Sequence, residues 1–216
     1  MATKSLLVGL TGGIGSGKTS VSDLLAALGA AVECSDKIVR ELQARGGAAL
    51  RAIVEAFGPE YLTADGELDR PKLGALVFND PQARTKLNLL IHPLVTGELQ
   101  RRAAAHRASQ REVIVLDIPL LLEGKKAGVG TGAVVKFDLI AVVYASPAQQ
   151  LERVTARDSL SETDAGARIG SQLSIEEKRA LADVVIDNTG TWEATEKQVR
   201  ELYAQWVARA RNESRA

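Results

Sequence analysis

Short apolar runs alternate along this chain with longer segments in which apolar residues recur at helical spacing. Strands that alternate with helices pair in parallel and are covered by helices on both faces. The pattern therefore predicts an α/β protein of three layers with a five-stranded parallel sheet in the middle. The expected strands are Leu6–Leu10, Ala31–Glu33, Val113–Asp117, Leu139–Tyr144 and Val184–Ile186.

The clearest expected helices lie directly after the first strand and at the end of the chain. Residues 18–28 place Val21, Leu24, Leu25 and Leu28 on one face, and Gly29 follows as a C-terminal stop. Residues 192–211 repeat this spacing with apolar side chains. Ser161 and Ser174 each precede acidic residues in the way that is typical of a helix start.

Two long segments without a strand divide the chain into parts. Residues 37–107 are expected to form an inserted helical lobe, in which Asp80-Pro81 and His92-Pro93 are among the breaks between helices. Residues 151–181 are expected to form a helical lid. The core would then comprise residues 1–36, 108–150 and 182–216. The glycine-rich stretch Gly124–Gly132 is expected to be a mobile loop.

Composition and charge narrow the class of protein. The 216 residues include 27 Lys and Arg and 27 Asp and Glu, so the formal net charge is zero. A neutral chain argues against binding to nucleic acids or to membrane surfaces, because proteins that do so usually carry an excess of basic residues. No apolar stretch is long enough to span a bilayer. Cys34 is the only cysteine, which excludes an internal disulfide. We expect a cytoplasmic protein, and nothing in the sequence indicates an obligatory protein partner.

The strongest chemical signal lies between the first expected strand and the first expected helix. Residues 12–19 read GGIGSGKT and fit the pattern GxxxxGK[ST] of a phosphate-binding loop. Glycines let successive backbone N–H groups point at phosphate oxygens, and the helix adds its positive end. Lys18 would neutralise the β- and γ-phosphates of ATP, and the Thr19 hydroxyl would bind Mg²⁺.

The phosphate loop alone does not identify the acceptor. A GTPase switch would specify guanine through an Asn-Lys-x-Asp element, which this chain lacks. A small-molecule kinase requires an acceptor lobe, a lid with arginines and a carboxylate near the acceptor hydroxyl, and each has a candidate here. Another small-molecule kinase or a nucleoside monophosphate kinase with the same loop remains the alternative.

Several polar residues stand where such a kinase needs them. Asp36 follows the second expected strand, where it is either a base for the acceptor hydroxyl or the N-cap of a helix over residues 37–43. Asp117 ends the third strand, where it is either a magnesium ligand or a turn residue. Arg153 and Arg157 share one helix face of the expected lid and either stabilise transferred charge or face solvent.

Over nearly its whole length the chain resembles the dephospho-coenzyme A kinase family. The resemblance is carried by Gly9–Thr19, Phe57-Gly58, Asp65–Arg70, Ile91–Leu94, Ile118–Glu123, Gln150–Arg153 with Arg157, Gln172 and Ala182–Asn188. One departure lies at Cys34-Ser35-Asp36, where members of this family usually carry Asp-Ala-Asp.

The resemblance implies transfer of the ATP γ-phosphoryl group to the ribose 3′-hydroxyl of dephospho-CoA. It implies that Asp36 is the catalytic base and that Lys18 and Arg153 stabilise charge. His92 would help to hold the acceptor or else brace the turn before Pro93, and His106 is interpreted as a surface residue. The expected ATP-binding residues are Gly13, Ile14, Gly15, Ser16, Gly17, Lys18, Thr19, Ser20 and Arg157. The expected acceptor-binding residues are Asp36, His92, Pro119 and Leu120, and the expected magnesium ligands are Thr19 and Asp117.

Overall fold

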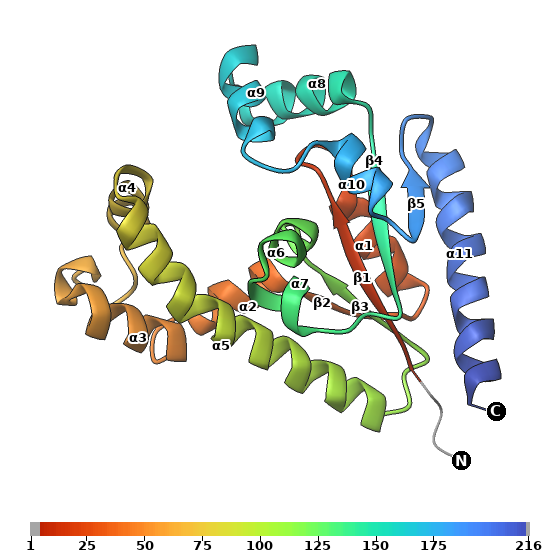
Figure 1. Cartoon of the computed structure of the whole chain (residues 1–216), viewed down its shortest axis with the longest axis horizontal. Coiled ribbons are helices and arrows are strands. Elements are labelled where there is room, and N and C mark those ends of the chain that lie inside the picture. Colours follow the sequence, from red (N-terminus) through yellow and green to blue (C-terminus); the bar gives the residue numbers. More distant parts are fainter. Residues whose placement is uncertain (1–4, 215–216) are drawn as a thin grey trace.

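The computed structural model describes residues 5–214, and a parallel sheet lies at its centre (Figure 1). The order of the strands in the sheet is β2-β3-β1-β4-β5, and every neighbouring pair is parallel. This confirms the predicted five-stranded sheet, with strand ends that differ from the prediction by at most two residues. The strands are β1 (Leu6–Gly12), β2 (Ala31–Cys34), β3 (Val113–Asp117), β4 (Leu139–Tyr144) and β5 (Val184–Asp187).

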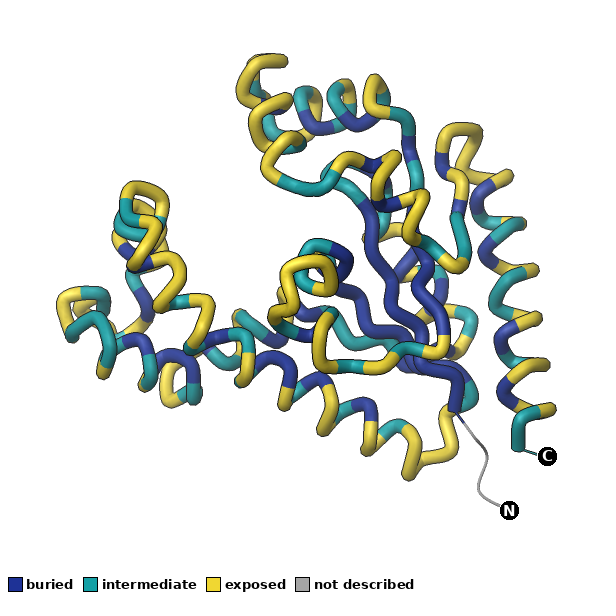
Figure 2. The backbone as a smooth tube through the Cα atoms, viewed as in Figure 1, coloured by how far each residue is buried: buried dark blue, intermediate teal, exposed yellow. Residues whose placement is uncertain are grey.

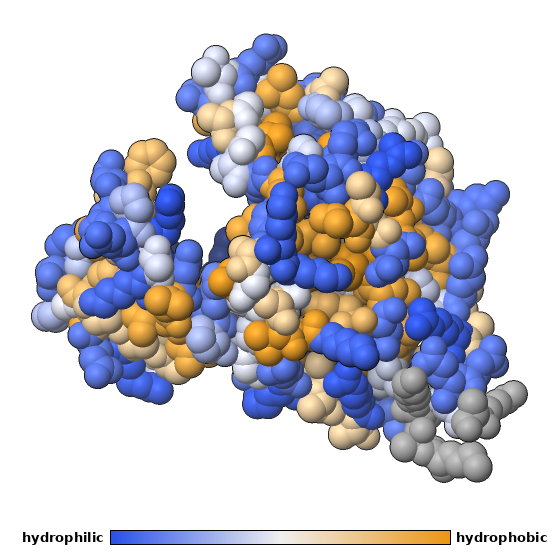
Figure 3. Space-filling model, viewed as in Figure 1, coloured by the Kyte–Doolittle hydropathy of each residue, from blue (hydrophilic) through white to orange (hydrophobic). Residues whose placement is uncertain are grey.

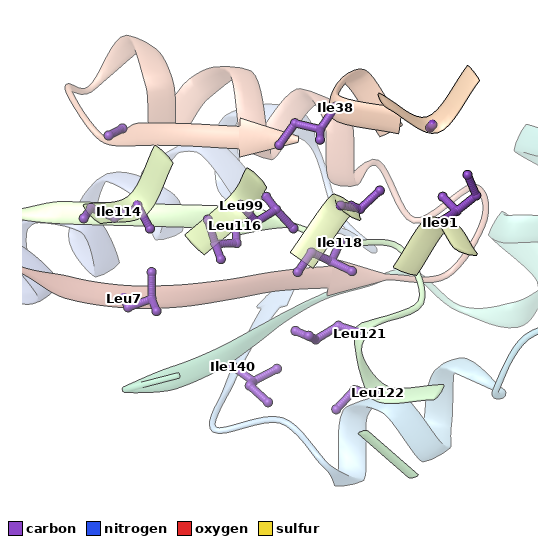
Figure 4. Close-up of a cluster of buried hydrophobic side chains, with 14 of the residues drawn as sticks. Leu7, Ile38, Ile91, Leu99, Ile114, Leu116, Ile118, Leu121, Leu122 and Ile140 are labelled. Carbon is purple, nitrogen blue, oxygen red and sulfur yellow. The ribbon is translucent and has the colours of Figure 1, made fainter. Parts of the chain in front are cut away.

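Helices cover both faces of the sheet, because alternate residues of each strand point to opposite sides. Leu6, Val8 and Leu10 pack with residues of α1 (Lys18–Ala27) and α11 (Trp192–Glu213). Leu7 lies in the other apolar cluster, with residues of α5 (Pro81–Ala108), α6 (Leu121–Ala127) and α10 (Ile175–Ala180). The close-up of this second cluster shows Leu99 beside Leu116 and Ile118 (Figure 4). The three-layer prediction is confirmed.

The segment between β2 and β3 is helical. It contains α2 (Ser35–Leu42), α3 (Ala48–Phe57), a short 3₁₀ turn η1 (Pro59–Tyr61), α4 (Arg70–Asn79) and α5. Asp69 caps α4 by accepting from Lys72 N, and Asp80 caps α5 by accepting from Gln82 N and Ala83 N. Helices α3 and α4 contact α5 and project away from the sheet with its first part, whereas the later part of α5 packs along the sheet (Figure 1).

The predicted break at His92-Pro93 is wrong, because α5 continues through Pro93 without interruption. Proline removes one backbone donor and clashes with the preceding turn, which costs about 3 kcal/mol in a helix interior. On either side of it, Ile91, Val95 and Leu99 are buried in the core, and their packing keeps the segment helical. His106, at the far end of α5, is also less exposed than predicted, since its Nε2 lies 2.7 Å from Glu33 Oε1.

The glycine-rich stretch after β3 is not the loop that was predicted. Helix α6 ends at Ala127, Gly128 and Gly130 take positive φ angles, and α7 (Gly130–Val134) follows at once. A Cβ atom on Gly132 would lie 2.2 Å from the Leu121 carbonyl oxygen. The glycines of this stretch therefore allow the two short helices α6 and α7 to pack closely, and the stretch is not a loop.

Helices α8 (Pro147–Asp158) and α9 (Glu162–Gly170) follow β4 and extend past the edge of the sheet at which the strands end (Figure 1). Their outer surfaces are exposed, in contrast to the strands (Figure 2). The expected helix starts at Ser161 and Ser174 are confirmed, because each hydroxyl accepts from a backbone N–H three residues later. Within residues 5–214, no helix has the length and apolar character to cross a membrane.

Candidate active site

The phosphate loop joins β1 to α1 with the expected geometry. Gly15 and Gly17 have φ angles of 78° and 88°, a conformation that favours glycine. Gly17 is the N-cap of α1 and provides no side-chain hydrogen bond to the helix. The N–H groups of the first helical turn thus have no capping side chain, which makes this end of α1 suited to an anion.

Side chains from two later parts of the chain donate hydrogen bonds to carbonyl oxygens of this loop. Asn188, directly after β5, donates from Nδ2 to Ser16 O at 2.8 Å. Arg153 on α8 donates to Gly15 O at 3.4 Å and to Asn188 O at 3.0 Å. A Cβ atom on Gly17 would lie 2.2 Å from Asn188 Nδ2, so glycine is required here on space as well as on φ. No role was predicted for Asn188 from the sequence, where the available signal was its place directly after a strand.

Lys18 and Asp117 form an ion pair between the first turn of α1 and the end of β3. Both side chains are largely buried, and Thr19 follows Lys18 in the same turn. Asp117 lies opposite Leu10 in the β1–β3 register and opposite Cys34 in the β2–β3 register. The ends of three neighbouring strands therefore bring the phosphate loop and the start of α2 to one edge of the sheet.

Asp36 lies in the first turn of α2, two residues beyond Cys34. The helix begins at Ser35 and its N-cap is Cys34, so the alternative in which Asp36 caps a helix over residues 37–43 is wrong. Asp36 is exposed, unlike its buried neighbour Ser35. Its carboxylate is thus available to a ligand at the edge of the sheet where Lys18 also lies.

A cavity of about 630 Å³ opens beside Asp36. Its walls come from α2, α5, the segment between β3 and α6, the α6–α7 pair and Gln172. It brings together all four residues expected to bind the acceptor, Asp36, His92, Pro119 and Leu120. The space-filling view shows an indentation between the projecting lobe and the rest of the molecule (Figure 3). Burial lowers the pKa of the His92 imidazole below its ordinary value of 6.5, which favours the neutral ring.

Arg157 does not join the phosphate loop in this structure. Its guanidinium pairs with Asp158, which in turn contacts Arg168, and about two thirds of the Arg157 side chain is exposed. Arg153, one turn earlier on α8, does reach the loop. The two arginines were expected to act together from one helix face. In the structure only Arg153 contacts the phosphate loop, whereas Arg157 pairs with Asp158.

A buried lysine that sequence reasoning missed lies beneath the site. Lys178 on α10 is fully buried and contacts Gly12 O, Pro119 O and Glu123 Oε1. Burial lowers the pKa of this amine, and the Glu123 carboxylate opposes that effect. Charged residues surround Lys178 in the sequence, and such a segment is usually exposed to solvent, so the sequence did not indicate that this lysine is buried.

The residues present fit a magnesium ion that would be shared with a nucleotide. Residues 5–214 contain no group of three His, Cys, Asp or Glu side chains that could hold a metal by themselves. Mg²⁺ at nucleotide sites takes one or two protein oxygens besides phosphate and water. The Thr19 hydroxyl and the Asp117 carboxylate supply oxygens of this kind beside the phosphate loop.

Comparison with known proteins gives a consistent result. A model of the dephospho-CoA kinase family matches residues 6–194. A curated protein named dephospho-CoA kinase, from Bacillus cereus (strain ZK / E33L), is 43% identical over 202 residues, covering 94% of this chain and 98% of its own. A solved structure from Thermus thermophilus has a TM-score of 0.73 at 31% identity, covering 94% of this chain and 98% of its own. The structure titled dephospho-CoA kinase from Campylobacter jejuni has a TM-score of 0.63 at 25% identity, covering 94% and 97%.

Proposed function

Because this chain belongs to the dephospho-CoA kinase family, we propose that it transfers the γ-phosphoryl group of ATP to the ribose 3′-hydroxyl of dephospho-CoA, giving CoA and ADP. The observation that carries the proposal is the common position of Lys18 and Asp36. Lys18 lies at the phosphate loop after β1 and Asp36 lines the cavity after β2, and both strands pair with β3 so that they end at one edge of the sheet. A donor and an acceptor would therefore meet between them.

On the donor side, the phosphate loop would hold the triphosphate through its backbone N–H groups and the end of α1. Residues Gly13–Ser20 make up this part of the proposed ATP site. Lys18 would exchange part of its contact with Asp117 for the β- and γ-phosphates. Arg153 already contacts the loop at Gly15 O, and from there it would stabilise the charge that spreads over the transferred group. Arg157 would join only if it left Asp158.

On the acceptor side, the cavity would hold the adenosine part of dephospho-CoA, with His92, Pro119 and Leu120 in its walls. The 3′-hydroxyl oxygen would attack the γ-phosphorus while the bond from that phosphorus to the β,γ-bridging oxygen breaks. Asp36 would accept the hydroxyl proton, and the leaving group is ADP.

Magnesium would be held by the Thr19 hydroxyl and by Asp117, the latter directly or through water. When bound, the ion neutralises charge on the β- and γ-phosphates. Asp117 would then serve both the ion and Lys18, with which it already forms a buried ion pair.

We further propose that α8 and α9 form the part that closes over the nucleotide. The expected lid of residues 151–181 also includes α10, but that helix is tied to the core by Ile175 and Lys178. The lobe of residues 37–107 would present the acceptor, with α2 and α5 as its side of the cavity.

The test is ADP formation from Mg-ATP with a panel of acceptors. The panel contains dephospho-CoA, nucleoside monophosphates, shikimate, gluconate and water alone. The proposal requires turnover that depends on dephospho-CoA. Turnover confined to nucleoside monophosphates would replace it with the alternative kinase, and GTP hydrolysis that needs no acceptor would favour a switch protein.

A further inference from the structure

The Lys178 ammonium is the centre of a buried set of contacts that joins separate parts of the site. Its side chain has an exposed fraction of 0%, although it lies on a short helix of otherwise exposed charged residues. An ammonium group has three hydrogens to donate. The three acceptors around Lys178 belong to three functional segments, so each hydrogen has its own partner.

The first acceptor is Gly12 O, at 3.3 Å from Nζ, in the last residue of β1, where the phosphate loop begins. The second is Pro119 O, at 3.0 Å, in the segment that walls the cavity. Pro119 O also accepts from the Thr11 hydroxyl at 3.0 Å. Lys178 and Thr11 thus connect Pro119, in the wall of the cavity, directly to the end of β1.

The third partner is Glu123, whose Oε1 lies 2.8 Å from Lys178 Nζ. The same oxygen accepts from Leu173 N at 3.0 Å, in the segment that returns from α9. Glu123 also lines the cavity. Through this carboxylate, Leu173 is connected to the lysine that also contacts Gly12 at the start of the phosphate loop and Pro119 in the cavity wall.

We propose that Lys178 is a positioning residue that sets the distance and orientation between the bound nucleotide and the acceptor hydroxyl. This inference rests on the proposed function. Lys178 contacts backbone oxygens and Glu123, so it acts on the reactants only through the segments that it holds. Removing its ammonium would leave the partly buried Glu123 carboxylate without its cation and would free Gly12 and Pro119 to move relative to each other.

Misalignment of the bound nucleotide and the acceptor hydroxyl changes a measurable product ratio that a loss of folding stability alone does not change. A displacement of about 1 Å costs on the order of 10²-fold in rate when two groups must be aligned. Because the phosphate loop itself remains, ATP still binds, but more of it is hydrolysed by water instead of reacting with the acceptor. The ratio of ADP formed to CoA formed therefore reports positioning separately from folding.

The experiment compares Lys178→Met, Lys178→Arg and the wild-type protein. CoA, ADP, the Kd of ATP and the thermal midpoint are measured for each. We expect Lys178→Met to lower kcat for CoA formation by about 10- to 100-fold and to raise the ADP:CoA ratio above one, with the Kd of ATP changed by less than about two-fold. Lys178→Arg keeps the charge and several donors and should recover part of the rate and the ratio.

The matched control is Lys126→Met. Lys126 pairs with Glu177 on the same helix as Lys178, but at 3.5 Å and with both side chains more than half exposed. The same chemical change there should leave the rate and the ratio unaltered, because exposed ion pairs contribute little. A lower thermal midpoint of Lys178→Met with wild-type kcat and a ratio of one would overturn the inference.

If Lys178→Met does not fold, Glu123→Gln takes its place. Glutamine keeps a carbonyl oxygen for Lys178 and for Leu173 N but removes the negative charge. A raised ADP:CoA ratio in this variant supports the inference, and a ratio of one with normal kcat contradicts it. Wild-type protein that forms no CoA at all would instead refute the proposed function, so the two failures are distinct.

Discussion

Lys18 in the first turn of α1 and Asp117 at the end of β3 form an ion pair in which both side chains are largely buried. The pair lies where the phosphate loop becomes α1, so a carboxylate holds in place the positive charge that we propose binds the triphosphate. This pairing links the stability of the fold to the chemistry of the site.

Replacing Lys18 with alanine should therefore affect two separate measurements. Loss of one charged donor at the transferred group should lower kcat by at least about 10²-fold. Loss of the buried partner should also lower the free energy of unfolding by roughly 3–5 kcal/mol. The double variant Lys18→Ala/Asp117→Asn should regain much of this stability and none of the activity. Recovery of both together would mean that Lys18 has no direct chemical role.

Asp36→Asn should keep ATP binding and lose most of the rate. Asparagine cannot accept the hydroxyl proton, and general-base assistance is typically worth about 10²–10⁴-fold. Steady-state kinetics with a separate titration of ATP measures this. Asp23→Asn, an exposed position on α1, is the matched control. Near wild-type turnover of Asp36→Asn would leave Asp36 without a catalytic role.

Arg153→Ala and Arg157→Ala should differ, although the two residues share a helix face. Arg153 contacts Gly15 O and Asn188 O, whereas the exposed Arg157 side chain pairs with its neighbour Asp158. Arg153→Ala should lower kcat by more than tenfold, about the effect of removing one charge-assisted contact. Arg157→Ala should change kcat by less than threefold. Equal losses would show that α8 rearranges to bring both arginines to the nucleotide.

The stability of the protein should depend on His92 at mildly acidic pH. Burial lowers the pKa of His92 in the folded state, so the unfolded chain takes up a proton first as the pH falls through 6.5. The folded protein therefore loses stability on acidification, and the loss levels off below the folded-state pKa. As the pH falls from 8 to 5, the unfolding free energy of the wild type should decrease relative to that of His92→Gln. Denaturant titration of both proteins at each pH measures this difference. A difference independent of pH would contradict this account.

The sheet and the phosphate loop could be predicted because local sequence specifies them. Apolar runs such as Val113–Leu116 have no stable place except a buried strand, and the glycines of the loop have few alternative uses. The position of Asp36 followed from the general rule that functional groups gather beyond the ends of parallel strands.

The errors arose where distant packing overrides local preference. Pro93 indicates a helix break, but burial of Ile91 and Val95 keeps α5 intact. Gly130 and Gly132 indicate flexibility, but Gly130 takes a positive φ angle at the start of α7 and Gly132 allows close packing against the Leu121 carbonyl oxygen. Lys178 could not be found at all, because its acceptors at Gly12 and Pro119 come from segments far away in the sequence.

The most direct test of the central claim is the identity of the phosphorylated product. Wild-type protein is incubated with Mg-ATP and dephospho-CoA, and the acceptor is analysed by mass spectrometry and ³¹P NMR. We expect one new phosphomonoester, on the ribose 3′-oxygen, formed in equal amount with ADP. ADP that accumulates while dephospho-CoA stays unmodified, or a phosphate on any other oxygen, would contradict it.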